Sequence, residues 1–175
     1  MIQGGDVLLT MADVAVGLAG FSGVVTAFSR TRDFPPEDRV RFLMLVGGTF
    51  FVILLAFVPF LLELGGMSER DTWRWSSGVW LLGVVGCTPL VLAGRRVIVR
   101  GGQPAPGWSL LLITAVSLAA ALAQLGNVLG WPYAPGPVPF LLGLVVGLVG
   151  SGAIFVYLVL IRPEPIESKE ARDNS

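Results

Sequence analysis

Five long apolar segments, separated by short polar connections, dominate the pattern of this chain. Each segment approaches the ~20 residues that an α-helix needs to cross a hydrocarbon layer of ~30 Å. Apolar runs of this length are typical of transmembrane helices rather than of strands. The pattern predicts an all-α integral membrane bundle of five transmembrane helices, with spans at about residues 7–28, 42–64, 75–94, 110–129 and 138–161.

The connections leave no room for a separate soluble domain. Residues 1–163 are therefore predicted to form a single transmembrane helical domain, and residues 164–175 a short charged tail. The prolines and acids of residues 33–38 predict that the second helix begins before its apolar segment, because a first helical turn tolerates proline and favours acidic groups. Pro59 and Pro89 lie inside apolar segments, where they are expected to bend the helices.

Composition supports the membrane assignment. Hydrophobic residues make up 54% of the 175 residues and charged residues 14%, whereas about 25% of residues are charged in soluble domains. Arg outnumbers Lys by eleven to one, and Ala, Gly, Val and Leu are abundant, as in proteins encoded by GC-rich bacterial genes. We therefore expect a multi-pass protein of the bacterial cytoplasmic (inner) membrane.

The basic residues predict the orientation, because Lys and Arg accumulate in loops that stay in the cytoplasm. Ten of the twelve lie in the first and third connections and the tail, while the second connection carries only Arg70 and Arg74. The N-terminus is therefore predicted to lie outside and the C-terminus in the cytoplasm. The first segment lacks a basic start and contains Asp13, so it is expected to be retained rather than cleaved as a signal peptide. Both Met1 and Met11 remain possible start residues.

Polar side chains inside the apolar segments are the costliest feature of the chain. Asp13 lies in the first segment and Glu63 near the end of the second. An ionised Asp at the centre of a membrane helix costs ~2.5 to 3.5 kcal/mol. The fourth segment carries Gln124 and Asn127. In the predicted topology all four fall in the outer leaflet, so we expect them to form one polar cluster.

Two interpretations of this cluster remain open. In the first, Gln124 and Asn127 donate hydrogen bonds to Asp13, Glu63 reaches the outer interface, and the group fixes the register of the helices. In the second, the acids line a water-filled vestibule or a cation site, because carboxylates within membranes often mark ion or proton paths. The first is favoured, because both acids lie nearer the membrane interface than the midplane.

Small residues one turn apart indicate where membrane helices approach closely. Asp13 shares a helix face with Gly17 and Gly20, so we expect its side chain to point toward protein rather than lipid. Leu144 is assigned to a different face of the fifth segment, away from its small residues. The predicted packing residues are Gly17, Gly20, Gly143, Gly147 and Ser151.

Several chemistries are disfavoured by residue usage. The sequence contains no His and a single Cys, Cys87, so the usual ligands of haem, zinc and copper and the usual nucleophile and base pairs are missing. We expect no enzyme, no cofactor and no metal site. Arg30, Arg32, Arg39 and Arg41 are interleaved with acids, which favours anionic lipid over nucleic acid as their partner.

Short motifs spread over most of the chain resemble small polytopic inner-membrane proteins of bacteria whose function is uncharacterised. The motifs are Leu18–Gly23, Glu37–Arg39, Pro59–Gly65, Trp73–Arg74 and Gln124–Asn127. The resemblance implies no activity.

We favour a non-enzymatic accessory or scaffold subunit of a larger membrane complex, or a homo-oligomer, whose partners are the lipid bilayer and other membrane subunits. The alternative is a small ion channel or transporter that uses the outer-leaflet polar cluster.

Overall fold

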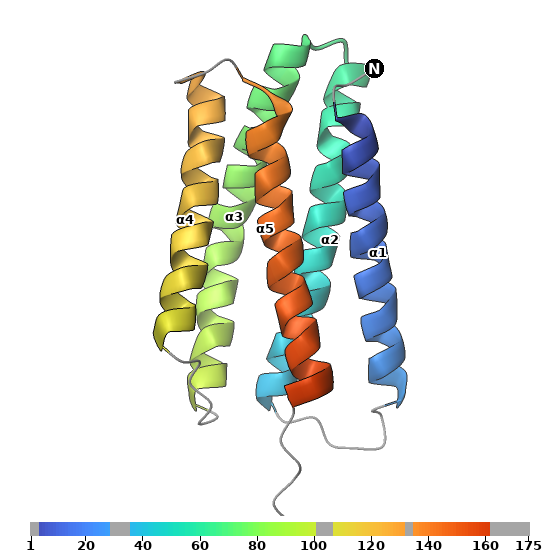
Figure 1. Ribbon diagram of the computed structural model, residues 1–175, viewed down its shortest axis with the longest axis vertical. Helices are drawn as coiled ribbons and strands as arrows, with labels where there is room; N and C mark the ends of the chain where they lie inside the picture. The colour runs from blue at the N-terminus through green and yellow to red at the C-terminus, as the bar shows by residue number, and fades with distance from the viewer. Residues whose placement is uncertain (1–3, 29–35, 101–106, 132–134, 162–175) are drawn as a thin grey trace, which may run out of the picture.

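The computed structural model describes residues 4–28, 36–100, 107–131 and 135–161, which form a bundle of five helices without a strand (Figure 1). All five helices are long and apolar enough to cross a membrane. The predicted all-α fold, with five helices long and apolar enough to span a membrane, is therefore confirmed. The helices are α1 (Gly5–Phe28), α2 (Pro36–Leu64), α3 (Glu69–Arg100), α4 (Gly107–Leu129) and α5 (Pro137–Val156), followed by a π-helical turn, Tyr157–Ile161.

Several helices extend beyond their apolar segments. α2 begins at Pro36, as the prolines and acids there predict, with Glu37 and Asp38 in its first turn. α3 has 32 residues and runs from Glu69 to Arg100. Its polar ends exceed the predicted span because backbone hydrogen bonding, rather than the thickness of the apolar layer, decides where a helix stops.

A tight turn joins α2 to α3. Gly66 adopts φ 81°, a left-handed conformation that glycine accepts without a steric penalty. The N–H of Met67 donates to the carbonyl of Leu62 at 3.2 Å, which closes the end of α2 in a Schellman-type motif. Ser68 then caps α3, since its Oγ accepts from the N–H of Asp71 at 3.2 Å and donates to the Asp71 carboxylate at 2.7 Å. These local contacts set the turn that makes the two helices antiparallel.

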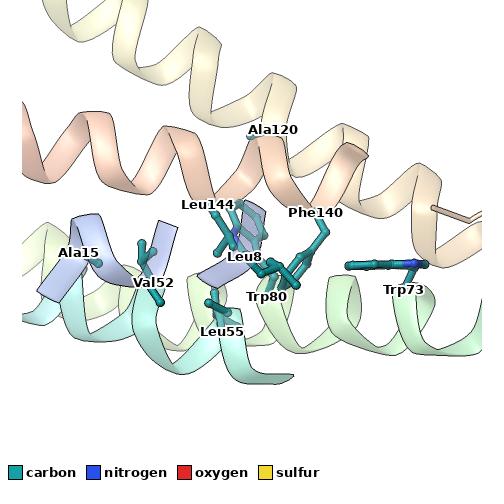
Figure 2. Packing of buried hydrophobic residues seen from close by; sticks show 11 residues of the cluster. Leu8, Ala15, Val52, Leu55, Trp73, Trp80, Ala120, Phe140 and Leu144 are labelled. Atoms are coloured by element: carbon teal, nitrogen blue, oxygen red, sulfur yellow. The ribbon is translucent and has the colours of Figure 1, made fainter. Parts of the chain in front are cut away.

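The buried core lies in the half of the bundle that contains the start of α1 and the start of α5. α2 packs against α1, α3 and α5, and α4 packs against α3 and α5. The rings of Trp73 and Phe140 meet at 5.9 Å between their centroids. The side chains of this core seen in Figure 2 include Leu8, Ala15, Val52, Leu55, Trp73, Trp80, Phe140 and Leu144.

Small residues of α5 lie in close contact with neighbouring helices. A Cβ atom at Gly143 would lie 2.9 Å from Nε1 of Trp80, and one at Gly147 would lie 3.0 Å from a side chain of α2. Ser151 is 4% exposed, and its Oγ would lie 2.7 Å from a Cβ atom at Gly48. Only small residues permit these helix separations, as the stripe in the sequence predicts.

Leu144, which the sequence assigns to a different face from the small residues, is fully buried as well. The reason is the position of α5 between two pairs of helices. It contacts α1 and α2 as well as α3 and α4. The covered arc of α5 is therefore wider than the stripe of small residues.

Candidate functional site

A cluster of buried amides lies where α4 ends and α5 begins. The Nδ2 group of Asn127 donates to Oγ of Ser77 at 2.8 Å and to the carbonyl of Gly136 at 3.1 Å, and it lies 3.3 Å from the carbonyl of Trp73. In return, Oδ1 of Asn127 accepts from the N–H of Gly136 at 2.9 Å. One side chain therefore links α3, α4 and the start of α5.

The start of α5 explains why an amide is useful at this position. Gly136 is the N-cap residue and provides no side chain to cap the helix. Pro137 and Pro139 lack an N–H group, which reduces the number of unpaired donors in the first turn. Oδ1 of Asn127 accepts from the N–H of the N-cap residue, so α4 supplies the bond that the Glu or Gln of a capping box would supply from within α5.

Gln124 is fully buried one turn before Asn127. Its Nε2 group donates to the carbonyl of Pro139 at 2.6 Å. The same amide group lies against Gly143, where a Cβ atom would collide with it. The close packing of α4 against α5 thus depends on the hydrogen bond from Gln124 to Pro139 and on the absence of a side chain at Gly143.

Four buried polar atoms near this cluster have no hydrogen-bond partner among the described residues: Thr72 Oγ1, Trp73 Nε1, Ser76 Oγ and Gln124 Oε1. An unpaired buried polar atom costs about 1 to 3 kcal/mol. The cluster contains neither an acid nor a base, so it can donate and accept hydrogen bonds but cannot itself carry a proton through a titrating group.

Asp13 lies elsewhere, on the outside of α1. Its side chain is exposed, and within the described part of the chain it forms no hydrogen bond or ion pair. Gly17 and Gly20 share its face, and no described residue beyond the neighbouring turns of α1 lies within 4 Å of a Cβ position at either glycine. These three residues define the open face of α1. Residues on the opposite side of the helix, Leu8, Ala12 and Ala15, contact the other helices instead.

The structure brings together only two members of the predicted polar cluster, Gln124 and Asn127. Glu63 is exposed near the end of α2, and Asp13 is exposed on α1. The sequence indicates how far along its helix each polar residue lies. Whether that residue faces another helix or the outside depends on the order of the helices around the bundle. Ser77 is the residue that sequence reasoning missed, and the hydroxyl pair Ser76-Ser77 inside a span was the available signal.

The opposite end of the bundle contains a buried ion pair. Nη1 of Arg41 donates to Oδ1 of Asp38 at 2.8 Å, with both side chains at most 10% exposed. The Arg41 guanidinium also lies 4.3 Å from the ring centroid of Tyr157, the first residue of the π-helical turn. Sequence reasoning treated Arg41 as a loop cation facing lipid, whereas it fastens α2 to the end of α5.

The described residues contain no group of three side chains that could hold a metal ion. No protein family, curated protein or solved structure matches the chain. The resemblance to small bacterial inner-membrane proteins therefore stays a prediction, and the function is argued from geometry.

Proposed function

We propose that this chain is a non-enzymatic accessory or scaffold subunit, which associates with other membrane helices through the open face of α1. The partner is another membrane protein or a second copy of the chain. The observation that carries this proposal is Asp13, an exposed acid without a partner within an apolar helix. It lies about 12 Å along the axis from Gly5, the first residue of α1, at ~1.5 Å per residue.

An acid facing hydrocarbon is costly, and a hydrogen-bond donor on a second helix reduces that cost. Gly17 and Gly20 allow the backbone of such a helix to approach closely, because no other described helix occupies the space beside them. The polar group and the small residues therefore favour the same event, which is docking of a helix against α1.

The channel or transporter alternative receives less support from the geometry. Gln124 and Asn127 form hydrogen bonds to backbone and side-chain groups of the bundle, while Asp13 and Glu63 lie on exposed surfaces. A conducting path needs polar groups that line one continuous route. These four residues do not line one common route, and the two amides stabilise the packing of the helices instead.

We further propose the orientation given by the positive charges, with the N-terminus outside and the C-terminus in the cytoplasm of a bacterium. A reporter active only in the periplasm should work when fused before Val7 or within residues 134–137, and it should fail after Ser175. Equal activity at both ends of the chain would contradict an odd number of crossings.

The proposed association is tested by purifying the tagged chain from its native membrane in mild detergent and identifying what remains bound. We expect a defined heteromer or homo-oligomer. Gly17→Leu should abolish it while the chain still folds, and Val14→Leu, on an exposed flank of α1, should preserve it. A chain that is monomeric in native membranes, or an assembly that survives Gly17→Leu, would refute the proposal.

A further inference from the structure

Two arginines in the first turns of α3 meet the end of α4. Nε of Arg74 donates to the carbonyl of Val128 at 3.0 Å. Nη2 of Arg70 would lie 3.9 Å from a Cβ atom at Gly130. The two arginines are four residues apart, so helix periodicity also places them on one side of α3, within ~40° of each other. The contacts and the periodicity therefore bring both guanidinium groups to one place.

Asp71 lies beside these arginines on α3. It precedes Arg74 by three residues, which separates the two by ~60° around the helix. Its carboxylate accepts a hydrogen bond from Oγ of Ser68 at 2.7 Å. Asp71 and the two arginines are exposed, and among the described residues none of the three forms an ion pair with another. Charges of both signs therefore lie close together without neutralising each other.

The exposed side chains around this charged group indicate its depth in the membrane. Trp75 on α3 and Trp131 just after α4 are exposed, and indole rings prefer the interface between headgroups and hydrocarbon. Farther along α3, Leu82 and Val85 are exposed within ~40° of the side that carries Asp71. The charged group therefore lies at the level of lipid headgroups, and an apolar surface extends from it along the helix.

We propose that Arg70, Arg74 and Asp71 bind the headgroup of one zwitterionic aminophospholipid of the phosphatidylethanolamine class. The phosphate contacts the two guanidinium groups, which bind phosphate through paired hydrogen bonds. The ammonium group, joined to the phosphate by a short two-carbon link, donates to the Asp71 carboxylate, while an acyl chain lies against Leu82 and Val85. A headgroup with both charges meets an opposite charge at each end, whereas an anionic headgroup would leave the carboxylate facing a like charge. The inference does not depend on the proposed docking of α1.

The test is native mass spectrometry of the whole chain in detergent, titrated separately with three lipids that have the same acyl chains. Phosphatidylethanolamine carries a phosphate and an ammonium with N–H donors, phosphatidylcholine carries a quaternary ammonium without N–H donors, and phosphatidylglycerol carries no ammonium. We expect one phosphatidylethanolamine to remain bound and the other two lipids to bind severalfold more weakly. Soluble phosphoethanolamine, which lacks acyl chains, should not bind detectably at the same concentrations.

Arg70→Gln tests the contact with the phosphate. Arg70 is exposed and forms no hydrogen bond or ion pair within the described residues, so its replacement should leave the fold intact. The variant should bind phosphatidylethanolamine about fivefold more weakly, because each basic residue beside a headgroup contributes about that factor. Arg96→Gln, which removes an exposed arginine at the other end of α3, is the matched control and should bind like the wild type.

Asp71→Asn tests the contact with the ammonium group. The variant keeps an acceptor for Ser68 but loses the negative charge, so phosphatidylglycerol should now bind more tightly than phosphatidylethanolamine. Glu69→Gln removes an exposed acid on nearly the opposite side of α3 and should preserve the wild-type preference. Equal binding of phosphatidylethanolamine and phosphatidylcholine to the wild type, an unchanged preference in Asp71→Asn or unchanged affinity in Arg70→Gln would overturn the proposal. Binding of phosphoethanolamine as tight as that of the lipid would also overturn it, because the acyl chains would then contribute nothing.

Discussion

The small-residue faces of α1 and α5 look alike in sequence but differ in the folded chain. In α5, Gly143 and Gly147 lie against side chains of three other helices. In α1, no other described helix comes within 4 Å of a Cβ position at Gly17 or Gly20, and Asp13 lies beside them. Glycine spacing permits a close helix contact. The contact forms within the chain only where another helix of the bundle faces the glycines.

The difference separates two roles for the same pattern. The α5 glycines are required by the fold, since the side chains of Trp80, Gln124 and Val52 occupy the space that a larger residue would need. The α1 glycines are not required by the fold, so substitutions there should be felt only in an assembly. This contrast can be tested by mutations whose effects differ widely in size.

The largest effect is expected for Gly143→Leu. The new side chain would enter the space of the Trp80 indole and the Gln124 amide, and overpacking of this kind costs about 3 kcal/mol or more. Thermal unfolding in detergent should show the loss of stability. Leu142→Ala, at an adjacent position that is 51% exposed, is the matched control and should unfold like the wild type. Equal stability of Gly143→Leu and the control would place this face of α5 against lipid.

Asn127→Leu should have the next largest effect. It removes the acceptor for the N–H of Gly136 and the donor to Ser77, which leaves buried polar groups unpaired at about 1 to 3 kcal/mol. Asn127→Asp keeps the acceptor but places a carboxylate beside the carbonyls of Trp73 and Gly136, so it should also be less stable than the wild type. If the leucine variant unfolded like the wild type in the same assay, the capping role of Asn127 would be disproved.

Smaller effects are expected at Asp13, and they concern association rather than folding. Asp13→Leu removes the polar group from the open face and should weaken the assembly by about threefold, given that hydrogen bonds between membrane helices average ~0.6 kcal/mol. Asp13→Asn retains hydrogen-bonding capacity and should assemble like the wild type. The subunit equilibrium can be measured by fluorescence energy transfer in liposomes. Equal loss of association in the Asn and Leu variants would show that the charge itself is required.

The smallest effect on stability is expected for Gly17→Leu. Its side chain would extend into open space, so the unfolding free energy of the isolated chain should stay within about 0.5 kcal/mol of the wild type. Measuring the unfolding of the monomer in detergent checks this directly. A destabilisation as large as that of Gly143→Leu would remove the distinction between the two glycine faces.

The number and approximate limits of the helices could be predicted from sequence, because membrane spans depend on apolar length alone. The start of α2 at Pro36 and the close contacts of Gly147 also follow from local chemistry. The partners of the polar residues could not be predicted. Asp13 and Asn127 are each placed by helix periodicity, but the rotation of α1 and α4 relative to each other depends on packing that no single segment encodes.

The burial of Arg41 illustrates the same limit. Its position beside the membrane predicts a cation in contact with lipid headgroups. The π-helical turn that begins at Tyr157 brings an aromatic ring over the guanidinium, and Asp38 one turn earlier supplies the countercharge. Neither the ring nor the widened turn can be recognised from the apolar pattern of the last segment.

The link between Asn127 and Gly136 also bears on how the chain folds during its synthesis. These residues are only nine positions apart, so the loop that they close is short and its entropic cost is small. The last two helices are therefore expected to pair as a hairpin soon after leaving the insertion machinery, before contacts with Trp73 and Ser77, fifty or more residues earlier, can form. The hairpin of α4 and α5 would then pack against the first three helices as a preformed unit.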